Sequence, residues 1–275
     1  MKKSSYKINM LLIPIILLFF ICINSNSAFA DDDTKPHFPP ILENDSRDKE
    51  KDQIKSPVKR SVILFKHKGK CYSGILVNPT DATKEKKYPG VLLLQIKDET
   101  PENWMDRMSD LSSEGYVVMA IKYRTYEDVK HALRNLRNLD IVDKSNIGVI
   151  GVHKGATEAI LLAIRNGKGV KCVVSVSGKP PYEVVGEDLA KKLPCPIMFV
   201  HGLIDTQVPS SVSQYLYYNC LDEGKKAKIF ILQNARHYFN DAEWSQSQIE
   251  FLKFLNLYLK GIPDPDEKEE EKKDK

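Results

Sequence analysis

Residues 147–155 read IGVIGVHKG, and this stretch indicates the type of fold. A short apolar run leads into a turn in which Gly151 and Gly155 lie two residues on either side of His153. The residues that follow, 154–166, have the apolar spacing of a helix. A buried strand that passes through a tight turn into a helix is the repeating unit of α/β proteins. The stretch therefore predicts a strand, a sharp turn centred on His153 and a helix.

Apolar runs of the same kind recur along the chain. Continuous apolar runs are typical of strands that are covered on both faces, as in a parallel sheet. They occur at residues 91–94, 117–121, 147–150, 173–176, 197–200 and 229–232. Residues 61–66 and 71–77 alternate instead and flank Gly69, which predicts an antiparallel hairpin.

Segments with helical periodicity separate the apolar runs. The clearest starts with the capping pair Thr125 and Asp128 and carries Val129, Leu133 and Leu136 on one face. Further helices are predicted at 102–114, 154–166, 210–223 and 241–260. Strands that alternate with helices predict the α/β class. We expect a three-layer α/β/α sandwich over residues 61–260, with a mostly parallel sheet and an N-terminal antiparallel hairpin.

The first thirty residues have the three parts of a secretory signal peptide. Three lysines within the first seven residues precede an apolar run at 10–23, and the small-residue site AFA follows at 28–30. The apolar run is broken by Pro14 and is shorter than the roughly 20 residues that a spanning helix needs. We expect cleavage after Ala30, a secreted or periplasmic location and no membrane attachment of the mature protein.

The segments on either side of the expected domain are rich in charge. Residues 31–60 and 261–275 contain hardly any clustered apolar residues, so we expect a disordered charged linker and a disordered charged tail. Residues 1–30 hold three lysines and no acids, so 38 basic residues then face 37 acidic ones. This near balance argues against a nucleic-acid partner.

Four cysteines remain after residue 30, and export would permit disulfides. Four cysteines allow three pairings. Cys172 and Cys195 begin neighbouring apolar segments at similar distances from the strand ends, so this pair is the first candidate.

Three polar residues follow apolar runs, and their order along the chain indicates a possible function. In open α/β sheets, ligands bind beyond the carboxyl ends of the strands. His153 follows the run at 147–150, Asp205 follows the run at 197–200, and His237 follows the run at 229–232. The order of elbow, acid and histidine is the order of triad residues in α/β-hydrolases. We therefore expect all three side chains at one edge of the sheet.

These segments resemble the dienelactone hydrolase and prolyl-oligopeptidase-like branch of the α/β-hydrolases. The turn at 151–155 has the shape of the G-x-S-x-G nucleophile elbow, with His153 in place of the serine. The segments 197–209 and 237–238 complete the resemblance, which covers about residues 61–260. It implies that Asp205 orients His237 as the catalytic base and that the substrates are esters, lactones or peptides.

The resemblance also implies backbone donors for an oxyanion, at Ile96 and Lys154. Such proteins usually carry a glycine-rich turn after the first core strand. This chain has Gln95, Ile96 and Lys97 there, and a β-branched residue resists the positive φ that glycine allows. The oxyanion site is thus a second departure from the family pattern.

Several hypotheses for function remain open. The leading one is a catalytically silent protein that binds a small molecule or a protein, with no cofactor and no metal, in which Asp205 and His237 remain as a hydrogen-bonded pair. Alternatively, the chain is an active hydrolase in which His153 attacks the substrate, or in which His153, Asp205 and His237 bind a divalent metal. A conventional serine hydrolase is not expected, because loss of the triad serine lowers turnover on the order of 10⁶-fold. Ser175, Ser177 and His201 are interpreted as structural residues.

Overall fold

The computed structural model describes residues 56–265 except 68, 97–98 and 185–186. The expected signal peptide, Lys97 and most of the expected linker and tail lie outside the described residues. Asp264, within the expected tail, is buried and accepts a hydrogen bond from Lys228 Nζ at 2.7 Å. Among the described residues, no helix is both long enough and apolar enough to cross a bilayer.

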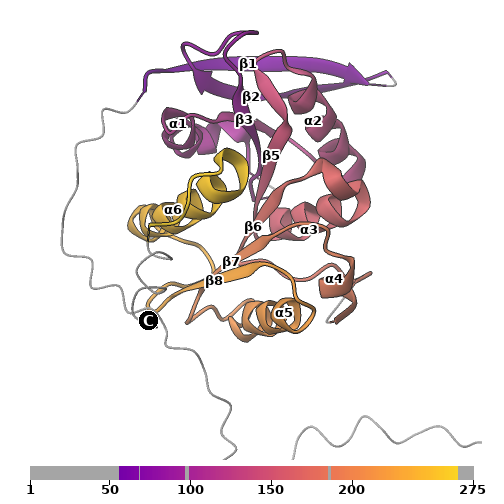
Figure 1. Cartoon of the computed structure of the whole chain (residues 1–275), viewed down its shortest axis with the longest axis vertical. Helices are drawn as coiled ribbons and strands as arrows, with labels where there is room; N and C mark the ends of the chain where they lie inside the picture. The colour runs from indigo at the N-terminus through magenta and orange to yellow at the C-terminus, as the bar shows by residue number, and fades with distance from the viewer. Residues whose placement is uncertain (1–55, 68, 97–98, 185–186, 266–275) are drawn as a thin grey trace, which may run out of the picture. The chain divides into compact units, whose positions relative to one another are not determined.

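Eight strands of the described chain form one sheet (Figure 1). They are β1 (Val58–His67), β2 (Lys70–Pro79), β3 (Tyr88–Leu94), β4 (Val117–Ile121), β5 (Val142–Val152), β6 (Cys172–Val176), β7 (Ile197–Gly202) and β8 (Ala227–Leu232). Their spatial order is β1-β2-β4-β3-β5-β6-β7-β8. β1 pairs with β2, and β2 with β4, in antiparallel fashion, whereas all the other neighbours are parallel. The predicted α/β fold with an N-terminal antiparallel hairpin is confirmed.

Helices cover both faces of the sheet. They are α1 (Met105–Ser113), α2 (Tyr126–Asn138), α3 (Lys154–Asn166), α4 (Glu187–Lys192), α5 (Ser211–Asp222) and α6 (Asp241–Leu255), with short 3-10 segments η1 (Pro101–Trp104) and η2 (Gly167–Gly169). α1 and α6 pack on one face and α2 to α5 on the other (Figure 1). The result is the predicted three-layer arrangement.

The helices differ from the prediction at a few ends. The segment predicted as one helix at 102–114 begins with the 3-10 segment η1, which starts at Pro101. The segment predicted at 241–260 ends in the π-helical turn η3 (Asn256–Lys260). The six-residue α4 was not predicted, because it is too short to display a helical period. The predicted capping box of Thr125 and Asp128 is present at the start of α2.

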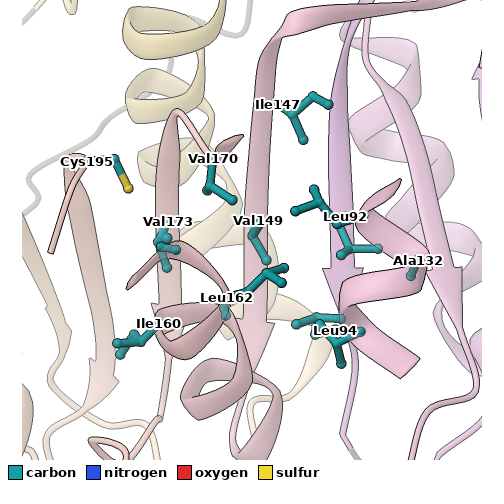
Figure 2. Packing of buried hydrophobic residues seen from close by; sticks show 14 of the residues in the cluster. Leu92, Leu94, Ala132, Ile147, Val149, Ile160, Leu162, Val170, Val173 and Cys195 are labelled. Atoms are coloured by element: carbon teal, nitrogen blue, oxygen red, sulfur yellow. The ribbon is translucent and has the colours of Figure 1, made fainter. Parts of the chain in front are cut away.

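Alternation along the buried strands divides the core into two clusters. Leu92, Val149 and Val173 point to the face covered by α2 to α5, where they meet Ile160 and Leu162 of α3 (Figure 2). The intervening strand residues pack against α1 and α6 on the other face. Strands buried on both faces therefore account for the continuous apolar runs in the sequence.

The same alternation separates the two cysteines that the sequence suggested as a disulfide. Cys172 belongs to the cluster under α1 and α6, whereas Cys195 belongs to the cluster on the opposite face (Figure 2). Val173 pairs with Ile197, so Cys195 shares the face of Val173 and not that of Cys172. Both are free thiols, and the suggested pairing is wrong. Burial raises the pKa of Cys195 to about 12, so its thiol is unreactive at neutral pH.

Candidate active site

The turn between β5 and α3 holds His153 in a strained backbone conformation. Its φ is 52° and its ψ is −113°, and histidine is among the residues with a β-carbon that adopt positive φ more often than the rest. Its N–H donates to Val176 O at 2.9 Å, which ties the turn to the end of β6. A β-carbon on Gly151 would lie 2.3 Å from Gly155 O, and one on Gly155 would lie 2.1 Å from Leu94 O. Only glycine fits at either position, so the neighbours of His153 determine the shape of the turn.

Asp205 and His237 form a hydrogen-bonded pair at the ends of β7 and β8. His237 Nδ1 lies 2.7 Å from Asp205 Oδ2, and because a carboxylate accepts, Nδ1 carries the proton. Asp205 Oδ1 accepts from the N–H groups of Gln207 and Val208, each at 2.8 Å. Burial alone would raise the pKa of Asp205, but the hydrogen bonds from Val208, His237 and Gln207 hold it below its ordinary value. A neutral His237 therefore has its lone pair on Nε2.

His201 supports the carboxylate from the other side. Its Nε2 lies 2.9 Å from Val208 O and 3.1 Å from Asp205 Oδ2, so this nitrogen carries the proton and donates. Its Nδ1 then accepts from Ser213 Oγ at 2.7 Å. The fully buried His201 is kept neutral because burial lowers its pKa. The sequence predicted only a structural role for His201. It gave no reason to single out Ser213, whose position within α5 follows no recognisable motif.

His153 lies against the face of His237. The ring centroids are 4.0 Å apart and the rings are inclined by only 18°. His153 Nε2 lies 2.7 Å from His237 O, and since a carbonyl only accepts, Nε2 carries the proton. Tyr238 contacts both rings edge-on. The three residues that the sequence predicted, His153, Asp205 and His237, thus come together at one edge of the sheet.

The stacking has a chemical consequence. The lone pair of an imidazole nitrogen lies in the plane of the ring, so two nearly parallel rings stacked face to face cannot hydrogen-bond to each other through their nitrogens. In a serine triad, the histidine takes a proton from the nucleophile through such a bond. The stacked arrangement of His153 and His237 does not provide it.

Burial and the neighbouring His237 lower the pKa of His153 to about 4. An unfolded histidine has a pKa near 6.5 and takes up a proton at a higher pH than the native residue does. The unfolded state therefore binds more protons between pH 6.5 and about 4, and the free energy of unfolding should fall as the pH falls through this window.

We expect the fall in the urea midpoint from pH 7 to pH 4 to be smaller in His153→Asn, because asparagine also tolerates positive φ but does not titrate. Urea unfolding of both proteins at a series of pH values measures the difference. An identical pH dependence of the two midpoints would contradict the depressed pKa.

A cavity of about 630 Å³ opens beside the two stacked imidazoles. Its wall includes His153, His237 and the two residues that the sequence predicted as oxyanion donors, Ile96 and Lys154. A smaller cavity of about 150 Å³ shares Ile96, His153 and Tyr238 with it, and its wall also includes the aromatic residues Trp104, Phe239 and Trp244. Both predicted donor residues thus lie near the histidines.

The metal hypothesis receives no support from the arrangement of donor atoms. Among the described residues, no group of three or more His, Cys, Asp or Glu side chains is placed so that it could hold a metal ion. The N–H groups of His237, Gln207 and Val208 occupy the carboxylate oxygens of Asp205. His153 uses Nε2 for the carbonyl of His237. These atoms are engaged in bonds that hold the site together.

Comparison with known proteins agrees with the observed fold. Residues 120–250, which include the elbow, Asp205 and His237, match the model of the dienelactone hydrolase family. The chain has a dienelactone hydrolase-like α/β-hydrolase fold. No curated protein sequence matches the chain. Within this fold, His153 lies in the turn between β5 and α3, Asp205 follows β7 and His237 follows β8.

Three solved structures illustrate the range of proteins with the same fold. A Klebsiella pneumoniae protein assigned as a dienelactone hydrolase is 16% identical, with a TM-score of 0.64 over 74% of this chain and 100% of its own. A dienelactone hydrolase-like promiscuous phosphotriesterase from metagenomic libraries is 13% identical, with a TM-score of 0.64 over 73% and 98%. The acylaminoacyl peptidase of Pyrococcus horikoshii is 17% identical, with a TM-score of 0.60 over 74% of this chain but 42% of the peptidase. At these identities, the likeness concerns the α/β-hydrolase fold.

Proposed function

We propose that this chain is an exported α/β-hydrolase-fold protein that binds a small molecule and does not hydrolyse esters by the serine mechanism. One observation carries the proposal: the ring of His153 stacks on His237 at 4.0 Å, where a triad nucleophile would share a hydrogen bond with the base. Export is supported by the charged, apolar and small-residue parts of residues 1–30.

The arrangement suits binding better than turnover for a second reason. The hydrogen bond of His153 Nε2 to the carbonyl of His237 and the stack together hold the ring in one orientation. The bonds to Asp205 hold His237 in one tautomer. The cavity beside the two rings is lined by apolar, aromatic and charged side chains, and a concave site that combines apolar surface with fixed polar atoms is the usual form of a small-molecule site. The near-neutral charge of the chain after residue 30 supports a ligand other than nucleic acid.

The second candidate is a hydrolase that uses His153 itself as the nucleophile. The lowered pKa of His153 favours it, because at neutral pH the ring is uncharged and Nδ1 has its lone pair available for attack. Asp205 and His237 would then transfer a proton to the leaving group. This candidate differs from the first in requiring His153 for turnover.

Hydrolysis of p-nitrophenyl acetate by residues 31–275 separates the two. We expect wild type and His153→Ala to release p-nitrophenol at the same rate, close to that of buffer alone. His237→Ala serves as a matched control for a general-base reaction that does not involve His153. Turnover by wild type that is lost in His153→Ala would reject the proposed function and establish His153 as the nucleophile.

A further inference from the structure

A second residue at the edge of the sheet has the same backbone strain as His153. Ser177 follows β6 with a φ of 47°, and these two are the non-glycine residues with positive φ in the described chain. Val152 pairs with Val176, and Val176 with Val200, so Ser177 lies between His153 and His201 along the strand ends. Positive φ is unfavourable for residues with a β-carbon, and such strain concentrates at functional sites.

The hydroxyl of Ser177 is also unsatisfied. The residue is 1% exposed, and its Oγ is buried without a hydrogen-bond partner among the described residues. Its N–H is used, since it donates to Val200 O at 2.8 Å. Ser177 lines the larger cavity together with His153 and His237. A buried hydroxyl without a partner is unfavourable, so a strained residue with such a hydroxyl in a cavity wall points to a ligand that supplies the missing bond.

The neighbouring polar atoms determine which hydrogen-bond donors and acceptors the ligand needs. Nε2–H of His153 donates to a carbonyl and Nδ1–H of His237 donates to Asp205. In its neutral form, each ring is left with one nitrogen that can only accept. The hydroxyl of Ser177 can donate or accept. A ligand group that donates as well as accepts, such as an alcohol or a phenol, matches this set, whereas an ether does not.

The rest of the cavity wall has an apolar part and a charged part. Ile96, Leu161, Pro181 and Val208 form the apolar part, and Tyr238 adds an aromatic side chain next to the histidines. The charged residues of the wall are Lys154, Glu158, Lys179 and Glu183. A six-membered carbon ring fits the apolar part, and a hydroxyl on the ring can meet the polar atoms at the strand ends.

We propose that Ser177 is a ligand-binding residue whose hydroxyl, with the imidazoles of His153 and His237, recognises a hydroxyl group on a ring. This proposal rests on the proposed binding function and assigns the class of ligand.

The test uses four probes and three proteins. Phenol and cyclohexanol carry the hydroxyl on an aromatic and on a saturated ring, and anisole and methoxycyclohexane are the matching methyl ethers. NMR titration of residues 31–275, followed on the imidazole and backbone signals, gives each Kd. In wild type, we expect at least one alcohol to bind about tenfold more tightly than its ether, a difference typical of one buried hydrogen bond. The alcohol that binds more tightly identifies the kind of ring.

Ser177→Gly removes the hydroxyl and relieves the positive φ, so the variant is expected to fold. We expect it to lose the preference for the alcohol. The matched control is Ser175→Ala, which alters a buried serine of β6 that does not line the cavity. This variant should keep the preference.

Equal affinity of alcohol and ether in wild type, an unchanged preference in Ser177→Gly, or no binding of any probe would each overturn the assignment of Ser177. Ester turnover by wild type would instead contradict the proposed function, and it is measured separately.

Discussion

His153→Ser should convert the protein into a slow esterase, with p-nitrophenyl acetate hydrolysed about 10³-fold faster than by wild type. The strained turn at residue 153 and the hydrogen bond from His237 to Asp205 are both present. In α/β-hydrolases, a turn of this shape carries the nucleophilic serine. A complete triad is worth on the order of 10⁶ in turnover. Ile96 occupies the loop where glycine would favour the oxyanion donor, and one lost donor reduces turnover by about 10²–10³.

Two measurements make this prediction specific to residue 153. A fluorophosphonate should label His153→Ser covalently, with the adduct located on residue 153 by mass spectrometry, and should leave wild type and His153→Ala unlabelled. The double variant His153→Ser with His237→Ala should lose the gain, because the base is then absent. A folded His153→Ser that stays at the wild-type rate, or a gain that persists without His237, would show that the remaining parts do not form a catalytic site.

Gly155→Ala should destabilise the domain by about 3 kcal/mol or more. The added β-carbon would lie 2.1 Å from Leu94 O and 2.9 Å from Leu94 C. Both are backbone atoms of β3 and cannot rotate away as a side chain can. Relief would require α3 to move off the centre of the sheet, where its buried face packs against Val149 and Val173.

Gly169→Ala is the control, because its β-carbon would first meet Arg137 Nη2 at 3.2 Å, the end of a flexible side chain. We expect a change within about 1 kcal/mol for this variant. Urea unfolding followed by circular dichroism measures both. Equal stability of Gly155→Ala and wild type would mean that the close packing of α3 on β3 is not required.

The fold could be predicted because its signals are local. Continuous apolar runs mark strands with two covered faces, and the capping pair Thr125 and Asp128 marks the start of α2. The place of His153, Asp205 and His237 could also be predicted, since the carboxyl ends of parallel strands meet at one edge. The cysteine pairing could not be rejected from the sequence, because the faces of Cys172 and Cys195 depend on the register in which Val173 pairs with Ile197.

The chemistry of the site depends on contacts that no pattern reveals. The stacking of His153 on His237 follows from the rotamers of two residues 84 positions apart. From the sequence, Ser177 is interpreted as a structural residue, because neither a positive φ nor an unpaired hydroxyl can be recognised from the spacing of residues. The support of Asp205 by His201 and Ser213 likewise emerges only when β7 and α5 pack together.

The two glycines of the elbow have a consequence for how this scaffold can diverge. Since Gly151 and Gly155 determine the path of the chain on either side of residue 153, the side chain at 153 can be exchanged for another that tolerates positive φ without rebuilding the fold. Lineages that share this turn can thus gain or lose an activity by drift at a single position, with the surrounding architecture preserved. The same independence makes residue 153 a suitable place to install a foreign reactive group, such as a cysteine that tethers a synthetic cofactor at the mouth of the cavity.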